Sequence, residues 1–109
     1  MTVREWIARR SPPPPATLTQ HVFAVLGRDA DADEARTADI CLDAAARALD
    51  GLLSENRFER ESALDLLAID ALTTYAYEHA SEARDSERTL QALAERGSQL
   101  LGQLVTQRV

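Results

Sequence analysis

The stretch ESALDLLAIDALTTYAYEHA, from Glu61 to Ala80, decides the fold class of this 109-residue chain. Its apolar residues recur at spacings of three and four, and six of them fill one face of a helix: Leu64, Leu67, Ala68, Ala71, Leu72 and Tyr75. Three more fall on other faces: Leu66, Ile69 and Tyr77. A helix that is apolar nearly all round is usually buried among neighbours. We therefore expect this segment to be the central helix of its fold.

Three other segments have the same helical spacing. The first runs from Thr17 to Gly27, and the second, from Asp33 to Leu53, carries a narrow stripe of mostly small residues that lets a neighbouring helix come close. The third has leucines at heptad spacing from Leu90 to Leu104. Apolar and polar residues do not alternate with a period of two, so strands are not expected. The sequence predicts an all-α fold, a small up-down helical bundle of about four helices.

Cap residues predict where these helices begin and end. Thr17 and Gln20 have the spacing of a capping box, and Gly27 suits a C-terminal cap. The stretch SENRFERE, residues 54–61, interrupts the periodicity. The helix that follows can be restarted by Asn56 with Glu59, or by Ser54 with residues 57–61 already helical.

A short helix is also predicted at the N-terminus. Thr2 and Glu5 have capping-box spacing, and the proline run at residues 12–15 ends the segment. Four consecutive prolines favour a stiff polyproline II spacer. Recognition of this run by an aromatic groove is the less favoured interpretation, because no flanking pattern specifies a reader.

This pattern divides the chain into two expected parts. Residues 1–15 form an N-terminal arm with a proline-rich spacer, and residues 16–109 form the helical bundle domain. A separate arm would present Trp6 and Ile7 to solvent. We therefore take these two side chains as candidates for an interaction surface.

Composition narrows the classes of function. The formal net charge of -6 argues against a surface that neutralises phosphates, so no nucleic-acid partner is expected. No apolar run reaches the roughly 18–20 residues of a membrane span, and residues 1–10 lack the apolar core of a signal peptide. Cys41 is the single cysteine and forms no internal disulfide. A cytoplasmic protein is expected, and its arginine and alanine bias is typical of a GC-rich bacterial genome.

The stretch GRDADADE, residues 27–34, resembles the start of a calcium loop. Counted from Asp29, an EF-hand needs glycine at its sixth position and glutamate at its twelfth, where this chain has Glu34 and Ile40. Asp31 and Glu34 instead have capping-box spacing, and acidic side chains stabilise a helix N-terminus. The sequence therefore predicts a helix start and no calcium site.

The two histidines raise the possibility of a metal site. A zinc site from His21, Cys41 and His79 is geometrically imaginable, but no local ligand spacing supports it. Ferritin-like sites need two copies of Glu-x-x-His, whereas EHASE reads Glu-His-x-x-Glu and occurs once. The favoured interpretation places both histidines at the edge of the core, with a buried thiol and no cofactor.

A polar strip on the central helix is the other candidate for ligand binding. Asp70 lies beside Thr73, Thr74 and Tyr77. This strip lines a pocket, faces solvent or makes a hydrogen-bonded polar contact between helices. No phosphate loop, nucleophile elbow or zinc-protease motif is present in the sequence. The candidate ligand-binding residues are Asp70, Tyr75, His79 and Glu82.

Two functions from different classes remain open. The first is a non-enzymatic protein that acts through protein–protein interaction, as a dimer or as a subunit of a larger bacterial assembly. The leucine stripe from Leu90 to Leu104 either closes the bundle or meets a second copy, and Leu101 at its flank is a further candidate for the interaction surface. The alternative is a bundle that binds a metal or a small ligand, with weak enzymatic activity built on that binding.

Overall fold

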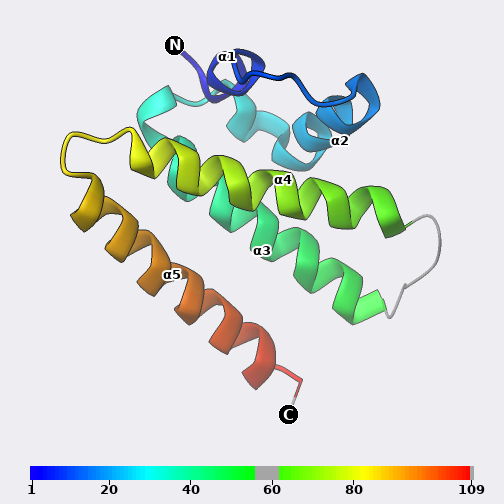
Figure 1. Ribbon diagram of the computed structural model, residues 1–109. Helices are drawn as coiled ribbons and strands as arrows, with labels where there is room; N and C mark the ends of the chain where they lie inside the picture. Colours follow the sequence, from blue (N-terminus) through cyan, green and yellow to red (C-terminus); the bar gives the residue numbers. More distant parts are fainter. Residues whose placement is uncertain (56–61, 109) are drawn as a thin grey trace.

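The computed structural model describes residues 1–55 and 62–108, and within them the chain is all-α, as predicted (Figure 1). The α-helices are α1 (Val3–Ala8), α2 (Ala16–Leu26), α3 (Thr37–Glu55), α4 (Ser62–Ser81) and α5 (Ser86–Thr106). Two short 3-10 turns, η1 (Gly27–Asp31) and η2 (Glu34–Arg36), connect α2 to α3. Extended pairing in the described residues is limited to one isolated bridge between Thr2 and Asp33.

Helix α4 is central, as predicted, because it packs against α2, α3 and α5. Helices α3, α4 and α5 run up and down, while α1 and α2 lie across one side of α4 (Figure 1). The buried side chains of α4 are small or aromatic around one leucine: Ser62, Ala68, Leu72, Tyr75, Ala76 and Ala80. Three alanines on this face let α2 and α3 approach the backbone of α4 closely.

The buried face of α4 differs in part from the predicted one. Leu67, which the periodicity places on the apolar face, is 54% exposed, and Leu66 is 46% exposed. Burial is centred on Leu72, which is completely inaccessible to solvent. Because α4 is apolar on nearly all sides, its sequence is compatible with several orientations, and packing against α2 and α3 selects one of them.

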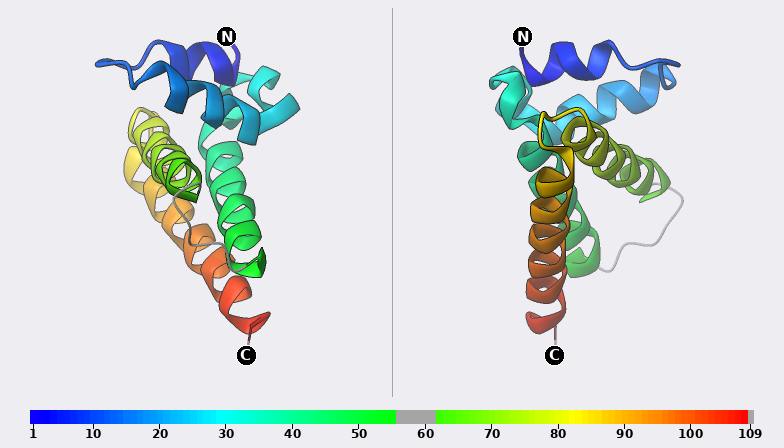
Figure 2. Two further views of the ribbon diagram at one scale, coloured as in Figure 1. Left: turned by 90° about the vertical axis from the view of Figure 1, so that its right-hand side faces the viewer. Right: turned by 60° about the vertical axis from the view of Figure 1, so that its left-hand side comes forward.

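The N-terminal arm is not a separate, exposed segment. Val3, Trp6 and Ile7 are 0%, 4% and 2% exposed and belong to the same core as the bundle. The expectation that Trp6 and Ile7 lie on an exposed surface is therefore wrong. The proline run reverses the direction of the chain, so α1 folds back beside α2 (Figure 2).

Backbone hydrogen bonds attach the arm to the turns before α3. The amide of Val3 donates to the carbonyl of Ala32 at 3.0 Å, and the amide of Glu34 donates to the carbonyl of Met1 at 2.9 Å. The predicted capping box of α1 is confirmed, because the Thr2 and Glu5 side chains each accept from the other's backbone amide. Local capping and these long-range bonds together fix where α1 lies.

The predictions for the remaining helix ends have mixed outcomes. Gly27 follows α2 with a φ of 56°, as expected for a C-terminal glycine. The capping box predicted at Thr17 and Gln20 is wrong, because α2 begins at Ala16 after Pro15 and has no side-chain cap. Pro15, directly before the first turn of α2, restricts the backbone at the start of this helix. The predicted cap at Asn56 lies outside the described residues.

Replacement by alanine is expected to change the free energy of unfolding in opposite directions at two glycines. A Cβ at Gly27 or at Gly51 meets no atom within 4 Å, so backbone conformation alone decides the effect. Gly51→Ala should raise the free energy of unfolding by about 0.5–1 kcal/mol, because Gly51 lies inside α3. Gly27→Ala should lower it by about 1–3 kcal/mol, because its φ is positive. Urea denaturation of both variants, followed by circular dichroism, measures these changes, and an equal effect of the two would contradict the account.

Candidate functional site

Three of the four candidate ligand-binding residues, Tyr75, His79 and Glu82, surround Trp6. The indole ring lies edge-on to Tyr75 at 6.2 Å and to His79 at 5.2 Å between ring centroids. Its Nε1 donates to Oε1 of Glu82 at 3.1 Å. These side chains therefore close around an aromatic ring of the same chain, and the cluster attaches α1 to α4.

Arg10 completes this cluster from the outside. Its guanidinium carbon lies 3.9 Å from the centre of the Trp6 ring, and its Nη1 donates to Oε2 of Glu82 at 2.9 Å. The hydrogen bond from Arg10 is the main cause that lowers the pKa of Glu82, and the bond from Trp6 adds to it. Because the pKa of Glu82 is lowered in the folded protein, its carboxylate stabilises the fold at pH values above the ordinary pKa of glutamate. This stabilisation is lost as the pH falls through the pKa that Glu82 has in the folded protein. Burial raises the pKa of Tyr75.

The histidines and the cysteine do not converge. Nε2 of His21 lies 2.6 Å from Oδ1 of Asp65, and Nε2 of His79 lies 2.8 Å from Oε1 of Glu34. Cys41 is fully buried in α3. Within residues 1–55 and 62–108, three or more side chains of the metal-binding types do not gather at one point. Each histidine instead forms a pair between two helical elements.

The aspartate run begins a helical turn, but not through the predicted residues. Oδ2 of Asp33 accepts from the amide of Ala35 at 3.0 Å and caps η2. Asp31 instead lies 3.4 Å from Nε of Arg4, and Glu34 faces a histidine. The capping box predicted from Asp31 and Glu34 is therefore wrong. The turn that Asp33 caps leads directly into α3.

The polar strip of α4 is divided between two environments. Asp70, the fourth candidate, is exposed and lies apart from the cluster around Trp6. The hydroxyl of Thr73 donates to the carbonyl of Ile69 at 2.8 Å, a bond within the helix. Thr73 and Tyr77 line a groove, whereas Asp70 does not.

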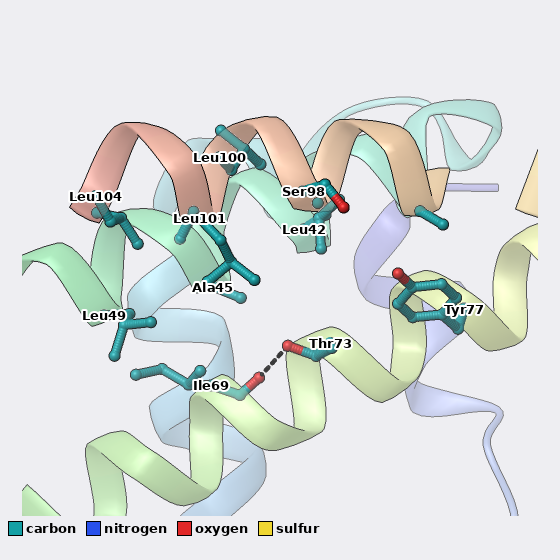
Figure 3. Close-up of a pocket in the computed structure, with 13 residues that line it drawn as sticks. Leu42, Ala45, Leu49, Ile69, Thr73, Tyr77, Ser98, Leu100, Leu101 and Leu104 are labelled. Atoms are coloured by element: carbon teal, nitrogen blue, oxygen red, sulfur yellow. Dashed lines mark hydrogen bonds between the residues drawn. The ribbon is translucent and has the colours of Figure 1, made fainter. Parts of the chain in front are cut away.

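This groove lies between α3, α4 and α5 and has a volume of about 390 Å³ (Figure 3). Its lining is mainly aliphatic, with three hydroxyl groups among the side chains. The labelled lining residues are Leu42, Ala45 and Leu49 from α3, Ile69, Thr73 and Tyr77 from α4, and Ser98, Leu100, Leu101 and Leu104 from α5.

The groove lies where α5 diverges from α4. Arg96 of α5 pairs with Asp43 at 2.7 Å, and Arg108, two residues after the end of α5, pairs with Asp50 at 2.8 Å, so two ion pairs connect α3 to this part of the chain. Helices α4 and α5 meet at their short connection and separate from there (Figure 2). The space between them opens toward solvent.

The leucine stripe of α5 faces the core, and the leucine at its flank, Leu101, is exposed to solvent. Leu93 and Leu104 are 4% and 9% exposed, and Leu90 and Leu100 pack against the core. Leu101, however, is 57% exposed. The stripe therefore closes the bundle, and Leu101 lies on the surface where the sequence placed it.

Exposed apolar side chains gather at the edges of this groove. Leu101 and Tyr77 line it; Val105 lies one turn beyond Leu101 on α5, and Leu66 lies one turn before the lining residue Ile69 on α4. Val105 is 62% exposed. Sequence analysis missed Leu66 and Val105 as surface residues. The signal that could have found Val105 is the uncharged run from Gly97 to Gln107.

Comparisons with known proteins identify no relative of this chain. No protein-family model matches it, and no curated protein or solved structure does so. Among the described helices, none combines the length and the apolar character that crossing a membrane requires.

The buried thiol gives a prediction that tests the packing of α3. Burial raises the pKa of Cys41 to about 12, and the side chain is fully inaccessible. Because the thiolate is the reactive form, we expect Ellman's reagent at pH 8 to leave Cys41 unmodified in the folded protein. Addition of 6 M guanidinium chloride should release one reactive thiol per chain. Rapid modification without denaturant would contradict this packing.

Proposed function

We propose that this chain is a non-enzymatic helical protein that binds a helix of another polypeptide in the groove between α4 and α5. The partner is either a second copy or another subunit of a larger bacterial assembly. The observation that carries the proposal is the open apolar groove lined by Tyr77 and Leu101, with the exposed side chains of Leu66 and Val105 one helical turn beyond its lining residues.

The spacing of these side chains suits a helical partner. On α4, Leu66, Ile69, Thr73 and Tyr77 follow one another at intervals of three and four, which places them along one face. Between two such helical walls, an amphipathic helix can lay its apolar face into the groove. Covering an exposed side chain such as Leu101 contributes about 1 kcal/mol, since it is already partly buried.

The charge of the chain argues against nucleic acid as the partner. A formal net charge of -6 opposes binding to nucleic acid, where phosphates must be neutralised. It also keeps the free protein soluble while apolar side chains remain at its surface.

Binding of a small apolar molecule in the same groove is the second candidate. The volume of about 390 Å³ falls within the range of pockets for small molecules. The hydroxyls of Thr73, Tyr77 and Ser98 could orient such a ligand. A ligand-binding function would therefore use this groove. The space between Tyr75, His79 and Glu82 is filled by the indole ring of Trp6.

Affinity capture from the cells that produce the protein tests the proposal. The groove variant is Leu101→Glu, and the matched control is Gln103→Glu, because residue 103 is exposed and lies roughly 200° around the helix from residue 101. We expect a protein, which can be the chain itself, to be retained by the wild type and the control and lost with Leu101→Glu. Identical retention by all three baits would refute a role for the groove.

A further inference from the structure

This inference rests on the proposed function and names the chemistry of the partner. We propose that the helix bound in the groove between α4 and α5 is a basic amphipathic helix, whose apolar face is flanked by arginine or lysine. The partner is then a different polypeptide and not a second copy of this acidic chain. Its basic side chains pair with three exposed carboxylates beside the groove, those of Asp70, Glu87 and Glu95.

The first argument is the position of these carboxylates on both walls. On α4, Asp70 lies one turn before Thr73, which lines the groove. On α5, Glu95 lies one turn before the lining residue Ser98, and Glu87 lies two turns closer to the start of the helix. The lining itself carries no charged side chain. The groove is therefore an apolar surface with acidic edges.

The second argument is that these carboxylates lack a partner in the described part of the chain. Most other carboxylates there form an ion pair or a hydrogen bond, as Asp43 does with Arg96 and Asp33 with a backbone amide. Those side chains that form neither are Asp39, Asp70, Glu78, Glu87 and Glu95. Three of these five border the groove. Their negative charge is thus available to a partner.

The third argument is that the walls offer no unpaired positive charge. Helix α4 contains neither arginine nor lysine. On α5, Arg88 pairs with Asp85 at 3.4 Å, and Arg96 pairs with Asp43 at 2.7 Å. The described arginines without an ion pair lie outside both helices: Arg9, Arg28, Arg36 and Arg84. An acidic partner helix would meet only like charge at these edges, whereas a basic one meets opposite charge.

The same charges argue against a second copy. Its α5 would bring a further Glu87 and Glu95 to edges that are already acidic, and each copy has a formal net charge of -6. For a basic partner, this net charge instead attracts the helix from a distance and accelerates its association. Charge complementarity therefore selects a partner of opposite charge.

The dimensions of the walls give the pattern of the partner. The lining residues of α5 run from Ala94 to Leu104, about 15 Å along the axis, so the apolar face of the partner extends over about three turns. Glu87 and Glu95 are eight residues apart, about 12 Å along α5. A helix alongside them carries basic residues seven or eight positions apart on that edge. A further basic residue on the opposite edge faces Asp70.

Selection from a displayed library of helical peptides tests this pattern, with the purified full-length chain as bait. The library keeps an apolar face of leucines at spacings of three and four. The positions that flank this face vary among arginine, lysine, glutamine, serine, aspartate and glutamate. We expect the retained peptides to be enriched in arginine and lysine at the flanking positions. Their binding should be lost with Leu101→Gln, which removes apolar surface from the groove without adding a charge.

Neutralisation of the edges tests which carboxylates attract the peptide. The groove variant combines Asp70→Asn with Glu95→Gln. The matched control combines Asp39→Asn with Glu78→Gln and removes the same charge from exposed, unpaired residues that line other surfaces. The affinity of a selected peptide at low salt should fall about 5-fold in the groove variant and less than about 2-fold in the control. In 1 M NaCl the difference should disappear, because charges are then screened beyond about 3 Å.

Circular dichroism should show equal helix content for the wild type and all three variants, since every substituted side chain is exposed. Retained peptides without a preference for basic flanks, or equal weakening by the two double variants, would overturn the inference. The proposed function would survive that result if Leu101→Gln still abolished binding.

Two further outcomes name a different occupant. If sedimentation equilibrium shows a dimer of the wild type that Leu101→Gln dissociates, the occupant is a second copy and the inference is wrong. If the selection yields no peptide whose binding depends on Leu101, both the inference and the helix-binding function are refuted. The groove would then be left to a small apolar ligand.

Discussion

Replacement of Trp6 by alanine should lower the free energy of unfolding by about 3–5 kcal/mol, the range for removal of a buried aromatic ring. The side chain is 4% exposed and packs edge-on against Tyr75 and His79. Its Nε1 also donates to Glu82, so the substitution removes a hydrogen bond between α1 and the turn that follows α4. Small domains unfold with about 5–15 kcal/mol, so this one change removes between about a fifth and all of the total.

Urea denaturation followed by circular dichroism measures this effect. Tryptophan fluorescence cannot be used, because Trp6 is the single tryptophan of the chain and the variant lacks it. Trp6→Phe is the matched control: it keeps a buried ring and removes only the N–H that Glu82 accepts. Its cost should be smaller than that of Trp6→Ala. A change below about 0.5 kcal/mol for Trp6→Ala, the size of a surface substitution, would show that α1 is not part of the core.

Leu72→Ala should have an effect of similar size, about 2–5 kcal/mol, because Leu72 is completely buried at the centre of α4. The cost combines the lost burial of apolar surface with the cavity that remains. Leu66→Ala is the control on the same helix, since Leu66 is 46% exposed. Both substitutions change helix propensity equally, so their difference reports burial alone.

We expect Leu66→Ala to cost less than about 1 kcal/mol in the monomer. The two variants are compared by their urea midpoints and slopes at one low protein concentration. Equal destabilisation by both substitutions would mean that α4 is rotated from the orientation in the structure. The groove would then lose its α4 wall.

Several features of the fold were predictable because their causes are local. The spacing of apolar residues by three and four predicts helices, since the hydrogen bonds of a helix join residues only four apart. The capping box of Thr2 and Glu5 and the positive φ of Gly27 likewise depend on neighbouring residues. The failed caps are also informative: Asp31 pairs with Arg4, from a different element, instead of capping α3.

The location of the N-terminal arm was not predictable in this way. Trp6 is held by Glu82, which is 76 residues away along the chain. The proline run after α1 suggested a spacer, and nothing near it in sequence indicates that the chain turns back. Burial of Trp6 and Ile7 depends on surfaces that exist only once α4 has packed.

What the sequence by itself determined is therefore the all-α class, some of the helix ends and the apolar character of α4 and α5. Tertiary structure alone decided which faces are covered: Leu72 is buried and Leu66 is not, and Leu104 is buried while Leu101 borders the groove. The physical reason is that helix formation satisfies hydrogen bonds within a few residues, whereas burial requires a second surface. Ion pairs from Arg96 and Arg108 join α5 and the residues after it to α3, and the groove lies where α5 diverges from α4.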